Sequence, residues 1–139
     1  MNNYDFFIQK PGIDPSLFHK IQKLRQIQDR DESLTNDDQA KELAYMMRGE
    51  ELVASASIYI CENSALIQRY LVSGIVNGLG VESIFYQNIL QSLIYRGVEN
   101  IYEFAGSPNK NILYELGFQQ TQEYFDIDGG YIPVIKYIP

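Results

Sequence analysis

The chain has 139 residues and a formal net charge of −7. This length fits one domain, so we expect residues 1–139 to form a single domain around one core. The acidic balance argues against a nucleic-acid partner, because phosphate contacts need clustered Lys and Arg, and it mildly favours cationic small molecules or basic peptides. No apolar run approaches the roughly 18 residues of a membrane span, and the start of the chain lacks a signal pattern. We therefore expect a cytoplasmic protein with no membrane partner.

Cys61 and His19 are the single cysteine and the single histidine. These counts exclude an internal disulfide and a Cys/His zinc site, and we expect no bound metal. A catalytic Cys–His pair would have to use both residues, so the ordinary alternatives are preferred. Cys61 is expected to be a small buried side chain in a strand, and His19 to lie on a helix surface.

A helix is predicted to begin at Asp14-Pro15, where Asp is a good N-cap and Pro suits the first helical position. It should end near Gln28. Its apolar positions recur at helical spacing and are Leu17, Phe18, Ile21, Leu24 and Ile27. Residues 29–39 are polar and rich in Asp, and predict either a short second helix or a loop.

Three strands are predicted next, over residues 44–48, 52–61 and 65–72, with turns at Gly49-Glu50 and Glu62-Asn63-Ser64. In the second strand Ala54, Ala56, Ile58 and Ile60 share one face. The three strands should form an antiparallel meander.

A glycine-containing loop over residues 73–80 leads into a second helix, which Gly97 should end. The apolar stripe of this helix is predicted to contain Val81, Ile84, Phe85, Ile89, Leu93 and Ile94. A short strand over residues 100–105 follows. Strand, loop, helix and strand make a βαβ unit, so the strands ending at Val72 and Ala105 should be parallel.

A short helix is expected from Pro108 to Tyr114, stopping at Gly117, and a hairpin from strands 118–127 and 131–138. The fold class is therefore α/β, with a mixed sheet and helices on both faces. The aromatic stretches at residues 4–7, 124–125 and 131–137 either line an acceptor pocket or pack in the core and hairpin.

The loop Ile75-Val76-Asn77-Gly78-Leu79-Gly80 has the composition of an anion site. Its glycines let the main chain approach a ligand, and the helix N-terminus behind it attracts a pyrophosphate. The spacing fits neither a P-loop nor a dinucleotide-binding motif. Alone, the pattern equally suits a tight turn.

The run Leu113-Tyr114-Glu115-Leu116-Gly117-Phe118 resembles the L-Y-E-K-L-G-F signature of the GNAT (Gcn5-related N-acetyltransferase) family, with one residue fewer before the glycine. That family places its acyl-CoA loop, Q/R-x-x-G-x-G/A, upstream at a strand-to-helix junction, where this chain has residues 75–80. Order and element types agree from about Leu52 onward. Residues 123–133 are similar to the ending of one bacterial branch of the family. Ile75 stands where the family has Gln or Arg, so a side-chain contact to phosphate is missing.

The resemblance implies a GNAT fold and an acyl-CoA-dependent N-acetyltransferase that uses acetyl-CoA as cosubstrate and no metal. The acyl group would pass to a primary amine of a small molecule or peptide by direct attack, without a covalent enzyme intermediate. Main-chain groups of residues 75–80 would hold the pyrophosphate, and Tyr70, Leu71 and Val72 would pair with the pantetheine arm between the parted parallel strands. Asn109 would lie near the cofactor; the alternative is a helix cap. Family habit also suggests a homodimer.

Two residues are implied to act in catalysis. Tyr114 matches the tyrosine that protonates the leaving thiolate, and its alternative role is to pack beneath the cofactor. Glu103 would accept the amine's proton through water or bind a cationic acceptor, and its alternative is a cross-strand pair with Arg69. Two other functions stay open: a non-catalytic GNAT-like module that binds acyl-CoA or a protein, and a fold without a ligand.

Overall fold

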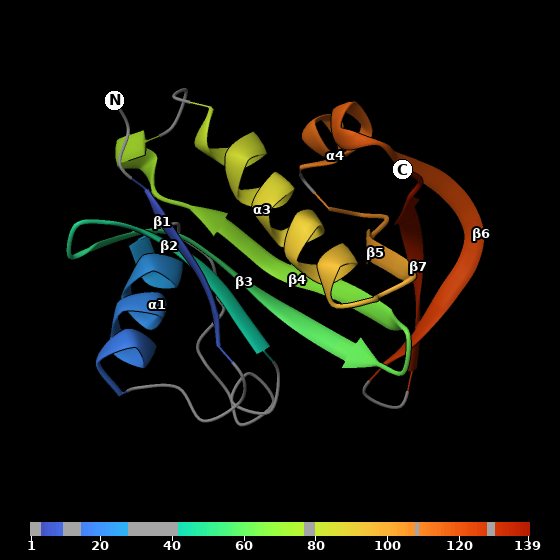
Figure 1. Ribbon diagram of the computed structural model, residues 1–139, viewed down its shortest axis with the longest axis horizontal. Coiled ribbons are helices and arrows are strands. Elements are labelled where there is room, and N and C mark those ends of the chain that lie inside the picture. Colours follow the sequence, from blue (N-terminus) through green and yellow to red (C-terminus); the bar gives the residue numbers. More distant parts are fainter. Residues whose placement is uncertain (1–3, 10–14, 28–41, 77–79, 108, 128–129) are drawn as a thin grey trace.

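A computed structural model describes residues 4–9, 15–27, 42–76, 80–107, 109–127 and 130–139. These residues form a seven-stranded mixed sheet in the order β1-β2-β3-β4-β5-β7-β6 (Figure 1). The strands are β1 (Asp5–Gln9), β2 (Glu42–Arg48), β3 (Glu51–Cys61), β4 (Ser64–Val72), β5 (Asn100–Phe104), β6 (Phe118–Ile127) and β7 (Gly130–Tyr137). β4 and β5 are parallel, and the other neighbours are antiparallel. The predicted mixed sheet with two parallel central strands is confirmed.

Helices cover both faces of the sheet, as predicted (Figure 1). The helical segments are α1 (Pro15–Ile27), the 3-10 turn η1 (Gly74–Val76), α3 (Val81–Tyr95) and α4 (Lys110–Leu116). α3 and α4 pack into the same core cluster on one face. α1 packs on the other face, where Leu17, Ile21 and Leu24 meet apolar residues of β2, β3 and β4. Residues 29–39, predicted as a helix or loop, lie outside the described residues.

The main core lies between α3 and the sheet. Ala54, Ala56 and Ile58 on β3 face this core, in agreement with the predicted alternation. Small alanines on the strands leave room for the large aromatic side chains of Phe85 and Tyr86, both fully buried on α3. This layer places the start of α3 beside the end of β4, because η1 and a few residues connect them.

The buried stripe of α3 differs from the predicted one. Its buried residues are Val81, Phe85, Tyr86, Ile89, Leu90 and Leu93. Ile84 and Ile94 were predicted to be buried, but their exposed fractions are 39% and 47%. They lie on the side of the helix away from the buried arc, which is centred between Phe85 and Leu93. Apolar residues occur almost all round this helix, so the sequence alone did not fix that arc.

β1 is an addition to the predicted elements. It pairs antiparallel with β2 at one edge of the sheet. Tyr4, Phe6 and Ile8 pack against the main core, so this aromatic stretch serves packing.

The single cysteine was predicted to be buried, which is wrong. Cys61 is the last residue of β3 and is exposed, because the strand reaches the β3–β4 turn there. His19 is exposed on α1, as predicted. Among the described helices, none is both long and apolar enough to span a bilayer.

Candidate active site

The two parallel strands part near their carboxyl ends. Their last residue pair is Ile67 with Glu103. β5 ends at the next residue, Phe104, whereas β4 continues to Val72 with β3 still paired on its other side. Segment 68–72 of β4 therefore has no strand partner on its β5 side among the described residues. We call this place the β4–β5 parting.

A bulge in β4 lies at the parting. Ser57 pairs with Gln68 and Ser55 pairs with Leu71, so β4 has one residue more than β3 between these pairs. Such a bulge bends the strand and increases its local twist. The bulge therefore coincides with the segment of β4 that no longer pairs with β5.

The main chain at the end of β4 is oriented toward the parting. The N–H of Ser73 donates to the carbonyl oxygen of Val53 on β3 at 2.7 Å. Because successive N–H groups of a strand alternate between its two edges, the N–H of Val72 faces the side of β5. A strand-like ligand could pair with it there.

The predicted anion loop is only partly described. Gly80 is the N-cap of α3 with φ of 75°, a left-handed conformation that favours glycine, and its carbonyl oxygen accepts from the N–H of Ile84. Val76 is fully buried, and its N–H donates to the carbonyl oxygen of Ser73 within η1. Ile75 contributes main chain to η1. Asn77, Gly78 and Leu79 lie outside the described residues.

A buried polar group lies beside the parting. Glu103 is 4% exposed, and its Oε2 accepts a hydrogen bond from Tyr86 Oη on α3 at 2.9 Å. Its Oε1 accepts from the N–H of Phe104 at 3.3 Å. The ring of Tyr86 stacks on Tyr70 of β4, with centroids 4.1 Å apart and planes 16° apart. Three elements thus meet at one carboxyl group.

The β4–β5 register does not favour the alternative pairing of Glu103 with Arg69. The residue opposite Glu103 on β4 is Ile67, and the described bonds of the carboxylate go to Tyr86 and Phe104. The side chain of Arg69 lies outside the described part of the chain.

Burial shifts the proton equilibria of this group. Loss of water raises the pKa of Glu103 to about 8, although the hydrogen bonds from Tyr86 and from the Phe104 N–H act in the opposite direction. Burial also raises the pKa of Tyr86 and of Tyr70 well above the usual value of a phenol, and the negative charge of nearby carboxylates adds to this. The tyrosines therefore stay neutral, and Glu103 titrates near neutral pH.

α4 begins beside the carboxyl end of β5. Ser107 Oγ accepts from the N–H of Asn109 at 3.2 Å, and the N–H of Ser107 donates to the carbonyl oxygen of Phe104 at 3.0 Å. Asn109 is the N-cap residue, but its side chain makes no capping hydrogen bond. Tyr114 is 39% exposed on α4. Whether it acts as an acid remains a prediction.

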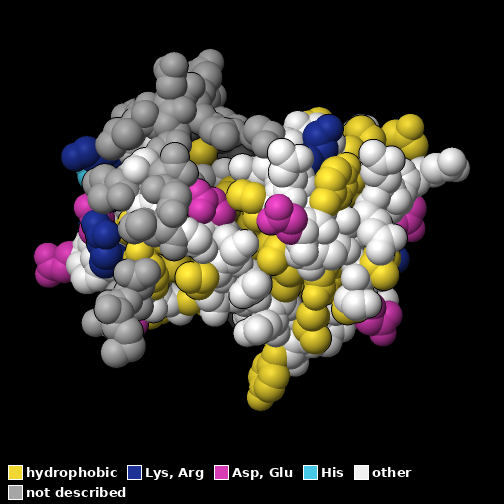
Figure 2. All heavy atoms as spheres, turned by 90° about the horizontal axis from the view of Figure 1, so that it is seen from above, with side chains coloured by type: hydrophobic (Ala, Val, Ile, Leu, Met, Phe, Trp, Pro, Cys, Tyr) yellow, Lys and Arg dark blue, Asp and Glu magenta, His cyan; other side chains and the backbone are white. Residues whose placement is uncertain are grey.

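Among the described residues, basic side chains are few at the end of the molecule where α3 begins. Figure 2 shows this face from the top of Figure 1, with acidic and hydrophobic side chains near its middle and Lys and Arg mainly toward its rim. Residues 70–95 contain neither Lys nor Arg. Within this range a phosphate would find main-chain N–H groups and neutral polar side chains but no cationic side chain.

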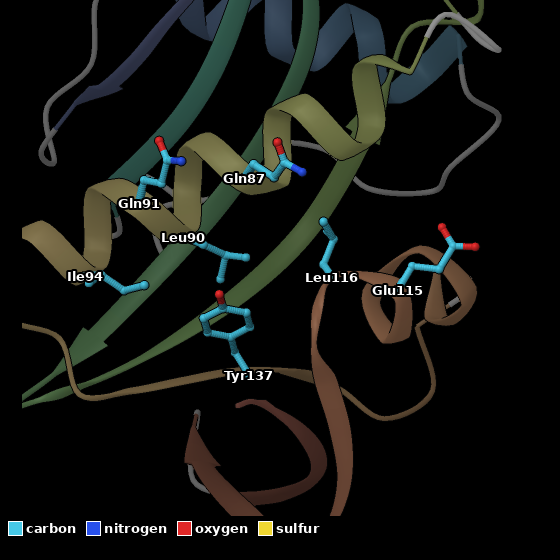
Figure 3. A pocket seen from close by; sticks show the side chains of 7 residues that line it. All are labelled: Gln87, Leu90, Gln91, Ile94, Glu115, Leu116 and Tyr137. Carbon is cyan, nitrogen blue, oxygen red and sulfur yellow. The ribbon is translucent and has the colours of Figure 1, made fainter. Parts of the chain in front are cut away.

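A hollow of about 440 Å³ lies between α3, the end of α4 and the end of β7 (Figure 3). Its lining residues are Gln87, Leu90, Gln91, Ile94, Glu115, Leu116 and Tyr137. None of the predicted site residues lines it. Since it flanks the second half of α3, we do not assign it to the site at the parting.

Solved structures share this arrangement of strands and helices over nearly the whole chain. Escherichia coli ElaA is 18% identical and covers 98% of this chain and 100% of its own, with a TM-score of 0.76. An acyl-CoA N-acyltransferase from Pseudomonas aeruginosa is 14% identical over 98% and 100%, with a TM-score of 0.74. The chain has the GNAT fold.

A solved structure that contains coenzyme A is also similar to this chain. N-acetylglutamate synthase from Neisseria gonorrhoeae, complexed with coenzyme A and L-arginine, is 12% identical, with a TM-score of 0.70 over 95% of this chain and 32% of its own. No family model matches this sequence, and no curated protein matches it. At sequence identities of 12–18%, these similarities establish the fold alone.

Sequence reasoning missed Tyr86 as a site residue of this GNAT fold. Its only sequence signal is its place in α3 one residue after Phe85, on a helix with many apolar positions. Its bond to Glu103 joins residues that are 17 positions apart, across the turn of a βαβ unit.

Proposed function

We propose that the chain is an N-acyltransferase that moves an acetyl or similar acyl group from acyl-CoA to a primary amine. The observation that carries this proposal is the β4–β5 parting, with a carboxyl group buried at its inner end. A strand edge without a partner can take an extended ligand, as in strand addition. The pantetheine arm of acetyl-CoA is such a ligand.

The chain offers two kinds of contact to acetyl-CoA. Main-chain groups of Tyr70, Leu71 and Val72 would pair with the pantetheine arm. The loop that ends at Gly80 would hold the pyrophosphate through main-chain N–H groups at the start of α3, where the helix dipole favours negative charge. Asn109, at the start of α4, does not use its side chain in a cap and would add a contact from the β5 side of the parting.

Acyl transfer needs no nucleophile from the protein. The amine nitrogen would form a bond to the thioester carbonyl carbon, and the carbon–sulfur bond would break. The nitrogen gives up a proton, which Glu103 would take through water because its carboxyl group is buried. The departing sulfur takes a proton, which Tyr114, a partly exposed phenol on α4, would supply.

The raised pKa of Glu103 suits this role above neutral pH. Its proton is lost only as the pH rises through about 8, so the carboxylate form that can accept a proton grows in that range. We expect the rate to rise with pH through about 8, where half of the carboxyl groups are ionised, and to level off at higher pH. Glu103→Gln should remove this limb.

The acceptor would be a small molecule or peptide amine in the cytoplasm. The net charge of −7 and the acidic side chains of the face in Figure 2 support a preference for cationic acceptors. A homodimer stays part of the proposal, without a surface assigned to it.

Calorimetric titration with acetyl-CoA and a thiol-release assay over a panel of amines test the proposal. We expect saturable binding, and thiol release that depends on both acetyl-CoA and amine. Tyr114→Phe should lower kcat by about 10- to 100-fold while acetyl-CoA still binds. Tyr95→Phe is the matched control, because Tyr95 is an exposed tyrosine at the end of α3 and has no role in the proposed mechanism, so it should behave as wild type. Absence of binding at millimolar acetyl-CoA would rule out the proposal.

A second candidate is an acyl-CoA-binding module without catalysis. Two observations favour it: Ile75 lacks a phosphate-binding side chain, and burial keeps Glu103 largely protonated at pH 7. Binding of acetyl-CoA without thiol release, at pH 7 and at pH 9, would select this function.

A further inference from the structure

Tyr70 carries a buried hydroxyl without a partner. Its side chain is 94% buried, since 6% of its surface is exposed, and Oη has no hydrogen-bond partner. A buried polar group left unpaired costs free energy, so native structures seldom keep one unless water or a ligand satisfies it. This hydroxyl therefore indicates a missing partner.

The hydroxyl belongs to the β4–β5 parting. Tyr70 lies in the β4 segment that has lost β5, within the bulge between Gln68 and Leu71. Its ring stacks on Tyr86, which bonds to Glu103 at the inner end of the parting. The charged groups that act on its hydroxyl are Glu82 in the first turn of α3 and Glu103 on β5.

Aromatic side chains of α3 pack against the ring of Tyr70. Phe85 also packs against Tyr70, with ring centroids 5.6 Å apart, so two rings of α3 hold it. A phenol fixed in this way is a pre-positioned donor for a neutral acceptor such as an amide or thioester oxygen. The arm of acyl-CoA contains such oxygens.

We propose that Tyr70 Oη hydrogen-bonds the acyl-pantetheine arm of the donor substrate and so serves as a binding residue of the β4–β5 parting. This inference rests on the proposed function and adds a side chain to a contact otherwise made by main chain. It also gives a physical reason for the orphaned hydroxyl, because the bound arm supplies the partner that the free protein lacks.

Tyr70→Phe tests the inference, because stability and binding should move in opposite directions. Removal of an unpaired buried hydroxyl should leave the free protein as stable or raise its Tm by about 2–5 °C. Loss of one neutral hydrogen bond should weaken acetyl-CoA binding by about 3- to 10-fold. Adenosine 3′,5′-bisphosphate, which lacks the pantetheine arm, should bind both proteins equally.

Tyr4→Phe is the matched control. Tyr4 also has a buried hydroxyl without a partner, but it precedes β1 at the far edge of the sheet. We expect this variant to keep wild-type affinity for acetyl-CoA. Equal affinity of wild type and Tyr70→Phe for acetyl-CoA would overturn the inference. Equal weakening of acetyl-CoA binding by Tyr70→Phe and Tyr4→Phe would also overturn it, and in both cases the proposed function stands. No binding of acetyl-CoA to wild type would instead remove the proposed function and the inference together.

Discussion

A single carboxyl group, that of Glu103, should make the stability of this protein depend on pH. Its pKa is raised in the folded state from 4.5 to about 8, so between these values the folded protein holds a proton that the unfolded chain has lost. The stabilisation that this bound proton gives to the folded state is therefore complete below pH 4.5 and is lost as the pH rises to about 8. The unfolding free energy falls by at most about 1.4 kcal/mol per pH unit over this range. Urea unfolding at pH 5, 6.5 and 8 should show this decline in wild type.

Glu103→Gln is the comparison that isolates the effect, because the amide oxygen can still accept from Tyr86 but the group no longer titrates. From pH 5 to pH 8 the unfolding free energy of wild type should fall relative to that of the variant. A difference that stays constant over this range would contradict a raised pKa.

The conformation of Gly80 leads to a prediction about main-chain strain. At φ of 75° an alanine is strained, although its Cβ would meet no atom within 4 Å. Gly80→Ala should therefore lower the unfolding free energy by about 1 kcal/mol. Gly74→Ala is the control, because Gly74 also has open space and has no such φ. Chemical denaturation measures both, and an equal loss in both variants would mean that φ is not the cause.

Residue chemistry was predictable from the sequence where it depends on local pattern. Gly80 stands at a strand-to-helix junction, and the structure gives it the left-handed conformation expected there. Glu103 was singled out as a carboxylate inside a central strand, and it is buried. Tyr86 and the hydroxyl of Tyr70 were not found, because their stacking and the bond to Glu103 depend on how α3 docks on β4 and β5. No local pattern encodes that docking.

At the scale of elements, α1 is held to the sheet mainly by one apolar stripe. Ile21 is fully buried among residues of β2, β3 and β4, on the face opposite α3. Ile21→Ala should therefore cost about 2–4 kcal/mol of unfolding free energy through lost burial and a cavity. His19→Ala, on the exposed side of the same helix, should change it by less than about 0.5 kcal/mol. Similar urea midpoints for the two variants would show that α1 is not held by this stripe.

Elements with strong patterns were predicted within two residues of their observed ends, as β3, β4 and β6 show. β1 was missed because its pairing with β2 joins distant parts of the chain. The orientation of α3 was partly wrong because Ile84 and Ile94 are as apolar as its buried residues. In each case tertiary contacts decide the outcome, which short-range periodicity does not contain.

At the scale of the whole molecule, the charge of −7 should act in opposite directions on the two proposed substrates. Acetyl-CoA is an anion that this field repels, whereas a cationic amine is attracted, and salt screens both effects. Raising NaCl from about 20 to about 300 mM should lower the KM for acetyl-CoA and lower kcat/KM for a cationic amine, each by about 2- to 5-fold. A neutral or zwitterionic amine of similar size should keep its kcat/KM. Because the two proposed substrates respond with opposite sign, a general effect of salt on the protein cannot mimic the result. Changes of the same sign would show that the overall field does not guide binding.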